Sequence, residues 1–194
     1  ETIITNIIEE KITRNHTEIM LESFESGIDI KTFNKERKIS IKGNKELKSK
    51  DITVPSDLSS ASFFIVAALI NKDSNIIINN VNLNPTRNGI LLALEKMGAN
   101  IIIKNKRIAN GEVIGDLEIR SSNLKGCELD KGIADLMIDE YPILAIAASF
   151  ASSPSLFKGV GELKVKESDR LELIRYNLVN CGVDCKVEKD SLFI

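Results

Sequence analysis

The sequence predicts an α/β (α+β) protein made of repeated helix–strand units. The chain has 194 residues, of which 43% are hydrophobic, so it can bury a sizeable core. Apolar residues at helical spacing alternate along the chain with short runs of Ile, Val and Leu that are typical of strands. One pattern of residues occurs three times, which indicates a structural repeat.

Each copy of the repeat has an Arg near a predicted helix start, a run of helix-forming residues and then a Gly. The three Arg–Gly pairs are Arg14 and Gly27, Arg87 and Gly98, and Arg170 and Gly182. We expect each Gly to end its helix, because a left-handed residue is favoured at that place.

The second and third copies extend further towards the N-terminus. Asp57 lies 30 residues before Arg87, and Asp139 lies 31 residues before Arg170. Each Asp precedes an apolar run, at residues 61–70 and 143–151, that is shorter than a membrane span and predicts a buried core helix. The first copy lacks this half, so we expect the chain to begin inside a unit.

A boundary between two parts is predicted near Lys50, which divides the chain into residues 1–50 and 51–194. Residues 34–51 are dense in Lys, Asn and Glu, apart from a short predicted strand at residues 39–41. The alternative is a long solvated hairpin inside one domain.

Charge and composition exclude several function classes. The net charge of -2 argues against a general binder of nucleic acid or membrane surfaces, and the 5% aromatic content argues against a base-stacking surface. Three cysteines, an odd and low number, are typical of a reducing, cytoplasmic compartment. Cys181 and Cys185 have a C-x3-C spacing, but His16 is far away in sequence, so packing cysteines are favoured over a zinc site.

Residues 164–170 are the richest segment for chemistry. Lys164, Lys166 and Arg170 surround a predicted helix start, with Ser168 or Asp169 as the N-cap. Such a helix start favours a phosphate or carboxylate ligand, and an Arg can grip a carboxylate through two parallel hydrogen bonds. The alternative is an ordinary charged helix start with a surface ion pair between Glu167 and Arg170.

A second candidate is Asp139, at the start of the apolar helix. A carboxylate there is either an N-cap or a catalytic base, and Asp57 holds the same place in the second copy. Only the third copy adds the Lys/Glu/Arg cluster downstream. We therefore interpret Asp57 as an N-cap and Asp139 as a candidate base.

The motifs around these residues resemble those of 5-enolpyruvylshikimate-3-phosphate synthases, most closely the class II bacterial branch. The motifs are Thr-Arg-Asn-His-Thr-Glu at 13–18, Val-Pro-Ser-Asp-Leu-Ser-Ser-Ala at 54–61, Asn-Pro-Thr-Arg at 84–87, Ile-Asp-Glu-Tyr-Pro at 138–142 and Lys-Glu-Ser-Asp-Arg at 166–170. They cover nearly the whole chain in order, with Asn15 in place of the usual Asp.

The resemblance implies an enolpyruvyl transferase fold with two lobes of three repeated units each, whose helices pack inside sheets. This chain then carries about half of the enzyme: residues 1–50 would close the second lobe, and residues 51–194 would supply two units of the first. The reaction implied is transfer of the enolpyruvyl group of phosphoenolpyruvate to the 5-hydroxyl of shikimate 3-phosphate, with release of phosphate. This is a step of the shikimate pathway, which leads to chorismate and the aromatic amino acids.

The resemblance also implies roles for residues. Asp139 would accept the hydroxyl proton, and Glu167 would protonate the methylene carbon, with Lys166 as the alternative acid. Arg14, Lys166 and Arg170 would bind the substrate anions. No metal or organic cofactor is expected, and the partners expected are the two small substrates and the remainder of the enzyme's own chain.

Three other functions remain as alternatives. One is the related transferase that uses UDP-N-acetylglucosamine, and another is a non-catalytic relative of the same fold. The third is an RNA 3'-phosphate cyclase relative, which the acidic balance disfavours.

Overall fold

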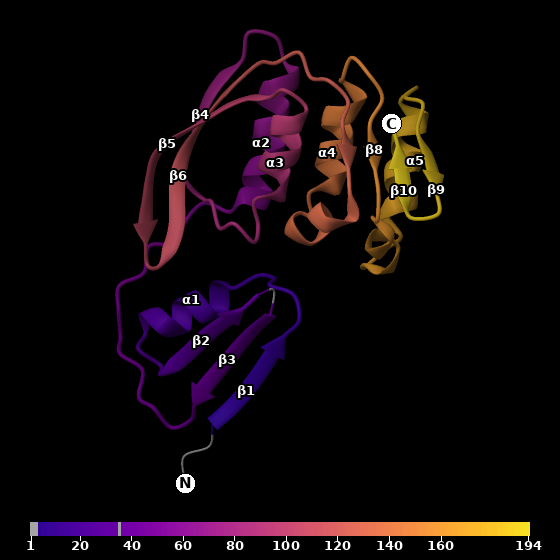
Figure 1. Ribbon diagram of the computed structural model, residues 1–194. Helices are drawn as coiled ribbons and strands as arrows, with labels where there is room; N and C mark the ends of the chain where they lie inside the picture. Colours follow the sequence, from indigo (N-terminus) through magenta and orange to yellow (C-terminus); the bar gives the residue numbers. More distant parts are fainter. Residues whose placement is uncertain (1–3, 35) are drawn as a thin grey trace.

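The computed structural model describes residues 4–34 and 36–194, which form three helix–strand units (Figure 1). The N-terminal unit consists of β1 (Ile4–Glu9), α1 (His16–Ser23), β2 (Ile28–Phe33) and β3 (Glu36–Lys42). Its sheet is antiparallel in the order β1-β3-β2.

The middle unit consists of α2 (Leu58–Ile70), β4 (Asn75–Asn82), α3 (Gly89–Lys96), β5 (Asn100–Ala109) and β6 (Glu112–Arg120). Its antiparallel sheet has the order β4-β6-β5, and a bridge from Ser56 to Val81 ties the chain before α2 to β4. A tight turn at Asn110 and Gly111, with φ of 52° and 83°, joins β5 to β6. Two successive left-handed residues are typical of the two-residue hairpin turn that Asn-Gly favours.

The C-terminal unit consists of the short strand β7 (Glu128–Leu129), η1 (Lys131–Leu136), α4 (Tyr141–Ser149), β8 (Leu156–Phe157), η2 (Gly161–Val165), α5 (Arg170–Asn180), β9 (Lys186–Glu188) and β10 (Ser191–Phe193). Its sheet has the order β7-β8-β10-β9, with β7 parallel to β8.

The middle and C-terminal units share one hydrophobic core, in which the helices lie between the two sheets (Figure 1). α2 packs against α4 and against β4 and β6, while α4 also contacts α3 and α5. Fully buried side chains such as Ile65, Leu94, Leu117, Leu144 and Phe157 fill this core. The predicted arrangement of helices inside sheets is therefore confirmed.

The two apolar helices are less completely buried than the sequence predicts. Phe63 and Phe64 of α2 are 60% and 67% exposed, and Ile146 of α4 and Leu173 of α5 are also open to solvent. These side chains line or border an apolar groove of about 440 Å³ between α2, α4 and α5. The expectation of buried core helices holds for one face of each helix and is wrong for the other.

Two of the three predicted helix-ending glycines are confirmed. Gly98 and Gly182 have φ of 79° and 82°, and the next residue donates its N–H back to the helix, as in a Schellman motif. In the N-terminal unit Glu25 takes this place instead, with φ of 55°, because the closing bond runs from Ser26 to Leu21. Gly27, with φ of 80°, lies two residues further on, so the prediction is wrong for this copy.

The N-terminal unit has little hydrophobic core of its own. Within residues 4–34 and 36–42, Ile39 is the one buried hydrophobic side chain, and Ile4, Ile7 and Ile8 of β1 are more than half exposed. Its buried centre is instead polar, with Arg37 paired to Glu18 at 3.5 Å. This unit therefore has less stabilising apolar burial than the other two.

The chain crosses from the first unit to the second close to Lys50. The Lys48 N–H still donates to the Phe24 carbonyl oxygen of the N-terminal unit, whereas the Thr53 carbonyl oxygen already accepts from Asn110 of the middle unit. Within the described residues, no helix is long and apolar enough to cross a membrane.

Candidate active site

Asp139 lies at the centre of a cluster of cations that come from both ends of the chain. Its Oδ2 is 2.9 Å from Nη2 of Arg14 in the N-terminal unit. Its Oδ1 is 3.3 Å from Nη1 of Arg170 and 3.9 Å from Nζ of Lys166, both in the C-terminal unit. Three of the four site residues other than Asp139 that the sequence predicts thus converge directly on one carboxylate.

The local backbone explains why Asp139 faces outwards. Met137, Ile138, Glu140 and Tyr141 on both sides of it are buried, and the Asp139 side chain is 35% exposed. Met137 packs so closely on the start of α3 that a Cβ added to Gly89 would lie 2.8 Å from it. The absence of a side chain at Gly89 therefore lets the segment before Asp139 lie against α3.

Asp139 is not a helix cap, which corrects one of the two alternatives from the sequence. α4 begins at Tyr141 with Glu140 as its N-cap residue, and no side chain caps that end. Asp57 does cap α2, because its Oδ2 accepts from the Ser60 N–H at 2.8 Å, so this interpretation is confirmed. Asp57 and Asp139 hold matching positions in the two repeats, but only Asp57 caps a helix.

The start of α5 has the predicted N-cap, which presents Arg170. The Asp169 carboxylate accepts from the Glu172 N–H at 2.9 Å, which leaves Arg170 as the first residue of the helix. Arg170 reaches two carboxylates at once: Nη1 contacts Asp139, and Nη2 lies 2.5 Å from Oε2 of Glu167.

Glu167, the fifth predicted site residue, lies on the outer side of the cluster. Its side chain is 78% exposed, and among the described residues its ion pair is with Arg170 and not with Lys166. Hydrogen bonds from its own backbone N–H and from Arg170 hold the pKa of Glu167 below its ordinary value. Glu167 is therefore ionised at neutral pH in this state.

The cations also keep Asp139 ionised. Partial burial opposes its charge, but the hydrogen bond from Arg14 and the charges of Lys166, Arg14 and Arg170 outweigh burial, so the pKa of Asp139 lies below its ordinary value. Two further carboxylates, Glu162 and Glu167, pair with Lys166 and Arg170 from the exposed side of the cluster. The three cations that converge on Asp139 are groups that suit a ligand with several negative charges.

Two further sets of contacts hold the N-terminal unit over this cluster, and the sequence did not predict them. Lys11 pairs with Asp135, and Asn84, which is only 2% exposed, donates from Nδ2 to Asn15 Oδ1 at 2.8 Å and to Glu112 Oε2 at 3.0 Å. Glu112 in turn lies 2.5 Å from Nδ1 of His16. Asn15 acts only as an acceptor here, so it can replace the usual Asp of the motif without losing the bond.

The other candidate features of the sequence lie outside the cluster. Lys164 bonds to Lys189 and Asp190, away from Asp139. All three cysteines are free. Burial raises the pKa of the Cys127 and Cys185 thiols, so these two are packing residues, whereas Cys181 is exposed and the packing interpretation is wrong for it. Within the described residues, no three His, Cys, Asp or Glu side chains gather as a metal site would require.

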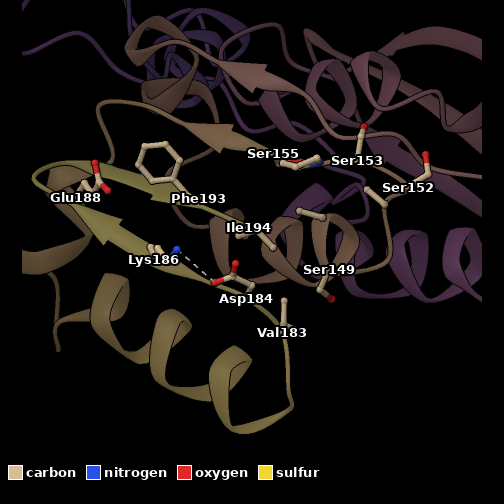
Figure 2. A pocket seen from close by; sticks show the side chains of 13 residues that line it. Ser149, Ser152, Ser153, Ser155, Val183, Asp184, Lys186, Glu188, Phe193 and Ile194 are labelled. Atoms are coloured by element: carbon tan, nitrogen blue, oxygen red, sulfur yellow. Dashed lines mark ion pairs between the residues drawn. The ribbon is translucent and has the colours of Figure 1, made fainter.

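A pocket of about 550 Å³ lies elsewhere, between the loop after α4 and the strands β9 and β10 (Figure 2). Serines 149, 152, 153 and 155 line one side of it, and Asp184 and Lys186, paired at 3.9 Å, line the other. It contains none of the predicted site residues, so this pocket is separate from the cluster around Asp139.

The match to a family model decides the family of this chain. The model described as EPSP synthase (3-phosphoshikimate 1-carboxyvinyltransferase) matches residues 1–194. The chain belongs to the EPSP synthase family. Its similarity to the 3-phosphoshikimate 1-carboxyvinyltransferases of Chelativorans sp. (strain BNC1) and Mesorhizobium japonicum is 50% and 48% identity, over 98% of the chain in both cases.

Solved structures agree with the family and with the fold. The EPSP synthase of Acinetobacter baumannii superposes with a TM-score of 0.90 at 42% identity, covering 98% of this chain and 42% of that one. The enolpyruvyl transferase NikO of Streptomyces tendae shares the fold at a TM-score of 0.64 and 15% identity. The chain spans about 42% to 43% of the length of these curated and solved relatives.

Proposed function

We propose that this chain is part of an enzyme that transfers the enolpyruvyl group of phosphoenolpyruvate to the 5-hydroxyl of shikimate 3-phosphate. The observation that carries the proposal is one ionised carboxylate, Asp139, held by Arg14, Lys166 and Arg170. Both substrates carry phosphate, and phosphoenolpyruvate adds a carboxylate, so a site lined by two guanidinium groups and one ammonium group suits them. The names of the relatives favour shikimate 3-phosphate over UDP-N-acetylglucosamine as the acceptor.

The reaction needs proton transfers at two places. The 5-hydroxyl oxygen attacks C2 of phosphoenolpyruvate and loses its proton, while C3 gains a proton and becomes a methyl group. Phosphate then leaves C2 with its bonding electrons, and C3 gives up a proton to restore the double bond. Positioned side chains accelerate such transfers by about 10²–10⁴-fold.

We assign the hydroxyl proton to Asp139. The three cations depress the pKa of Asp139, which makes it a weak base. Substrate anions that draw Arg14, Lys166 and Arg170 to themselves would remove that effect and let the pKa rise towards its ordinary value. Substrate binding would thus convert Asp139 from the partner of the cations into the base.

We assign the exchange at C3 to Glu167 or Lys166. Glu167 is exposed and ionised. In this form it can take the proton that C3 gives up in the second step, but it must itself be protonated before it can donate a proton to C3 in the first step. Lys166 carries protons on its ammonium group and lies between Asp139 and Glu162, 3.2 Å from the latter. Arg170 would bind phosphoenolpyruvate. Arg14, which lies in the N-terminal unit, would bind the phosphate of shikimate 3-phosphate.

We also propose the domain assignment that the repeat and the family suggest. Residues 1–50 close one lobe of the enzyme, and residues 51–194 supply two units of the other. The change of partners between Lys48 and Thr53 supports a boundary near Lys50. The exposed apolar face of α2, α4 and α5 is consistent with a further unit that packs there.

The decisive experiment is Asp139→Asn in an enzyme of the relatives' full length that carries this sequence. We expect kcat to fall by about 10²–10⁴-fold, because the amide cannot accept the proton. The Kd for shikimate 3-phosphate, measured by calorimetry, should change by less than about tenfold, because Asn still accepts a hydrogen bond from the hydroxyl.

Asp57→Asn is the matched control, since Asn preserves the cap of α2. Asp57 lies 3.9 Å from Arg87 but contacts neither Asp139 nor the three cations around it. It should leave kcat within about threefold of the unaltered enzyme, as expected for a conservative cap replacement. Near-normal turnover of Asp139→Asn would remove Asp139 from the mechanism.

A further inference from the structure

The residue after Asp139 is a buried carboxylate that the proposed chemistry does not use. Glu140 has a side chain only 1% exposed, and its Oε1 accepts a hydrogen bond from the Ser59 hydroxyl and lies 3.6 Å from Nη2 of Arg87. Its second oxygen has no hydrogen-bond partner among the described residues. A carboxylate is costly to bury even when it is paired, so its presence calls for a reason.

The repeat gives the first part of that reason. Arg14, Arg87 and Arg170 hold matching places in the three units. Arg14 and Arg170 bind Asp139, whereas Arg87 binds its neighbour Glu140. All three repeat arginines therefore act on two consecutive carboxylates, one facing the site and the other facing inwards.

The start of α4 gives the second part. Glu140 is the N-cap residue of α4, yet its side chain caps nothing, while Asp57 and Asp169 cap α2 and α5 by side-chain hydrogen bonds. The side chain at the N-cap of α4 instead reaches Ser59 in the first turn of α2 and Arg87 ahead of α3. The start of α4 is thus fixed by contacts to α2 and to the segment before α3.

We infer that Glu140, Arg87 and Ser59, here called the buried anchor, position the catalytic carboxylate of Asp139. Glu140 and Asp139 share a peptide bond, so a change in the direction of one side chain turns the backbone that carries the other. The anchor acts through Asp139 and touches no substrate. This inference rests on the proposed function, because it concerns the geometry of the proposed base.

The test is a double-mutant cycle in the full-length enzyme with Glu140→Gln and Asp139→Asn. Glu140→Gln removes the charge that Arg87 binds but keeps the shape and an acceptor for Ser59. We expect kcat to fall by about 10–100-fold with both KM values within about threefold, because a small misplacement of a reacting group affects mainly the chemical step. In the Asp139→Asn background the same change should alter kcat by less than about twofold, because the carboxylate that Glu140 positions is no longer there.

Glu118→Gln is the matched control. Glu118 is a buried carboxylate on β6 paired with Lys104 and Arg120, away from Asp139. Its replacement should lower the melting temperature without changing kcat. The anchor would be merely structural if the fold-losses in kcat of the two single variants multiplied in the double variant. The same would follow if Glu140→Gln had the kcat of the unaltered enzyme.

A second variant covers failure of Glu140→Gln to fold. Ser59→Ala removes one donor to Glu140 and leaves its charge pair with Arg87, and it is put through the same cycle with the same criteria. An Asp139→Asn enzyme with normal turnover would instead overturn the proposed base itself. The single variant therefore tests the proposed function, and the cycle tests the anchor.

Discussion

Three side chains from distant parts of the chain form ion pairs with Asp139, and this changes what its replacement should do. A capping residue exchanged for Asn would leave stability nearly unchanged, since Asn caps as well as Asp. Asp139 caps nothing, so in Asp139→Asn the cations Arg14, Lys166 and Arg170 face one another without a central anion. The replacement therefore carries a cost in stability that depends on pH.

We predict that Asp139→Asn lowers the melting temperature of this 194-residue chain by about 2–4 °C at pH 7. The pairs are partly exposed, so their combined contribution is on the order of 1 kcal/mol, which corresponds to that shift for a chain of this size. The pKa of Asp139 is depressed in the folded state, so its contribution is present above the ordinary value of about 3.9 and is lost as pH falls through the folded value. The melting temperatures of the two proteins should converge as the pH falls below about 4, and a constant difference at all pH values would contradict the ion-pair origin.

The guanidinium group of Arg170 binds two carboxylates at once, and the single ammonium group of a lysine cannot reproduce this geometry. Its two terminal nitrogens contact Asp139 and Glu167 separately. In the full-length enzyme we expect Arg170→Lys to raise the KM for phosphoenolpyruvate by roughly tenfold or more, and that for shikimate 3-phosphate by much less, because the bidentate grip on a carboxylate is lost. Steady-state kinetics with each substrate varied in turn measure this difference, and equal effects on both KM values would assign Arg170 to a structural ion pair.

At the scale of elements, local signals in the sequence predict helix ends well. Asp57 and Asp169 cap their helices, and Gly98 and Gly182 end theirs, because each of these depends on bonds within one turn. Strand-like runs at 101–103 and 117–119 fall in β5 and β6, but the tight turn that joins these strands went unpredicted, although Asn110-Gly111 is a strong hairpin signal.

Contacts between units are what the sequence pattern could not provide. The motifs singled out Asp139, Arg14, Lys166 and Arg170, but not that one carboxylate would bind all three cations. The contacts of Glu140 with Arg87 and of Asn15 with Asn84 join residues 53 and 69 positions apart, and no local periodicity encodes such pairs. Asp139 was open to interpretation as a cap because Glu140, a poor capping residue, takes that place.

The segment that connects the N-terminal and middle units is the part of the chain that we expect proteases to cut first. Strand β3 is the central strand of its sheet, so residues 36–42 are protected, whereas residues 45–55 have no helix or strand. We expect limited proteolysis to cut first between residues 45 and 55, at the lysines Lys48 or Lys50 if trypsin is used, because irregular exposed backbone opens most easily. Mass spectrometry of the first fragments measures this, and early cleavage within α2 would show that the two parts are divided elsewhere.

At the scale of the whole molecule, this chain supplies some of the catalytic and substrate-binding groups that the proposed reaction needs. The described residues bring together one inner carboxylate and three cations, and the contacts with the N-terminal unit place Arg14 opposite the other two cations. The chain covers about 42% to 43% of the length of its relatives, and the apolar face of α2, α4 and α5 lies open. Both observations favour a complete site that needs the rest of the enzyme.

We therefore predict that this 194-residue chain alone does not turn over and that it gains activity when the rest of the enzyme is added as a separate chain. Phosphate release from phosphoenolpyruvate and shikimate 3-phosphate should match the blank for the chain alone and rise above it in the mixture, because burial of the exposed apolar face would favour association of the two chains. Phe63→Ser is the diagnostic variant: Phe63 is 60% exposed and lines the apolar groove, so the change should weaken the complementation and leave the folding of the isolated chain intact. Turnover by the chain alone would show that the cluster around Asp139 is a sufficient site. Complementation insensitive to Phe63→Ser would place the missing unit on a different face.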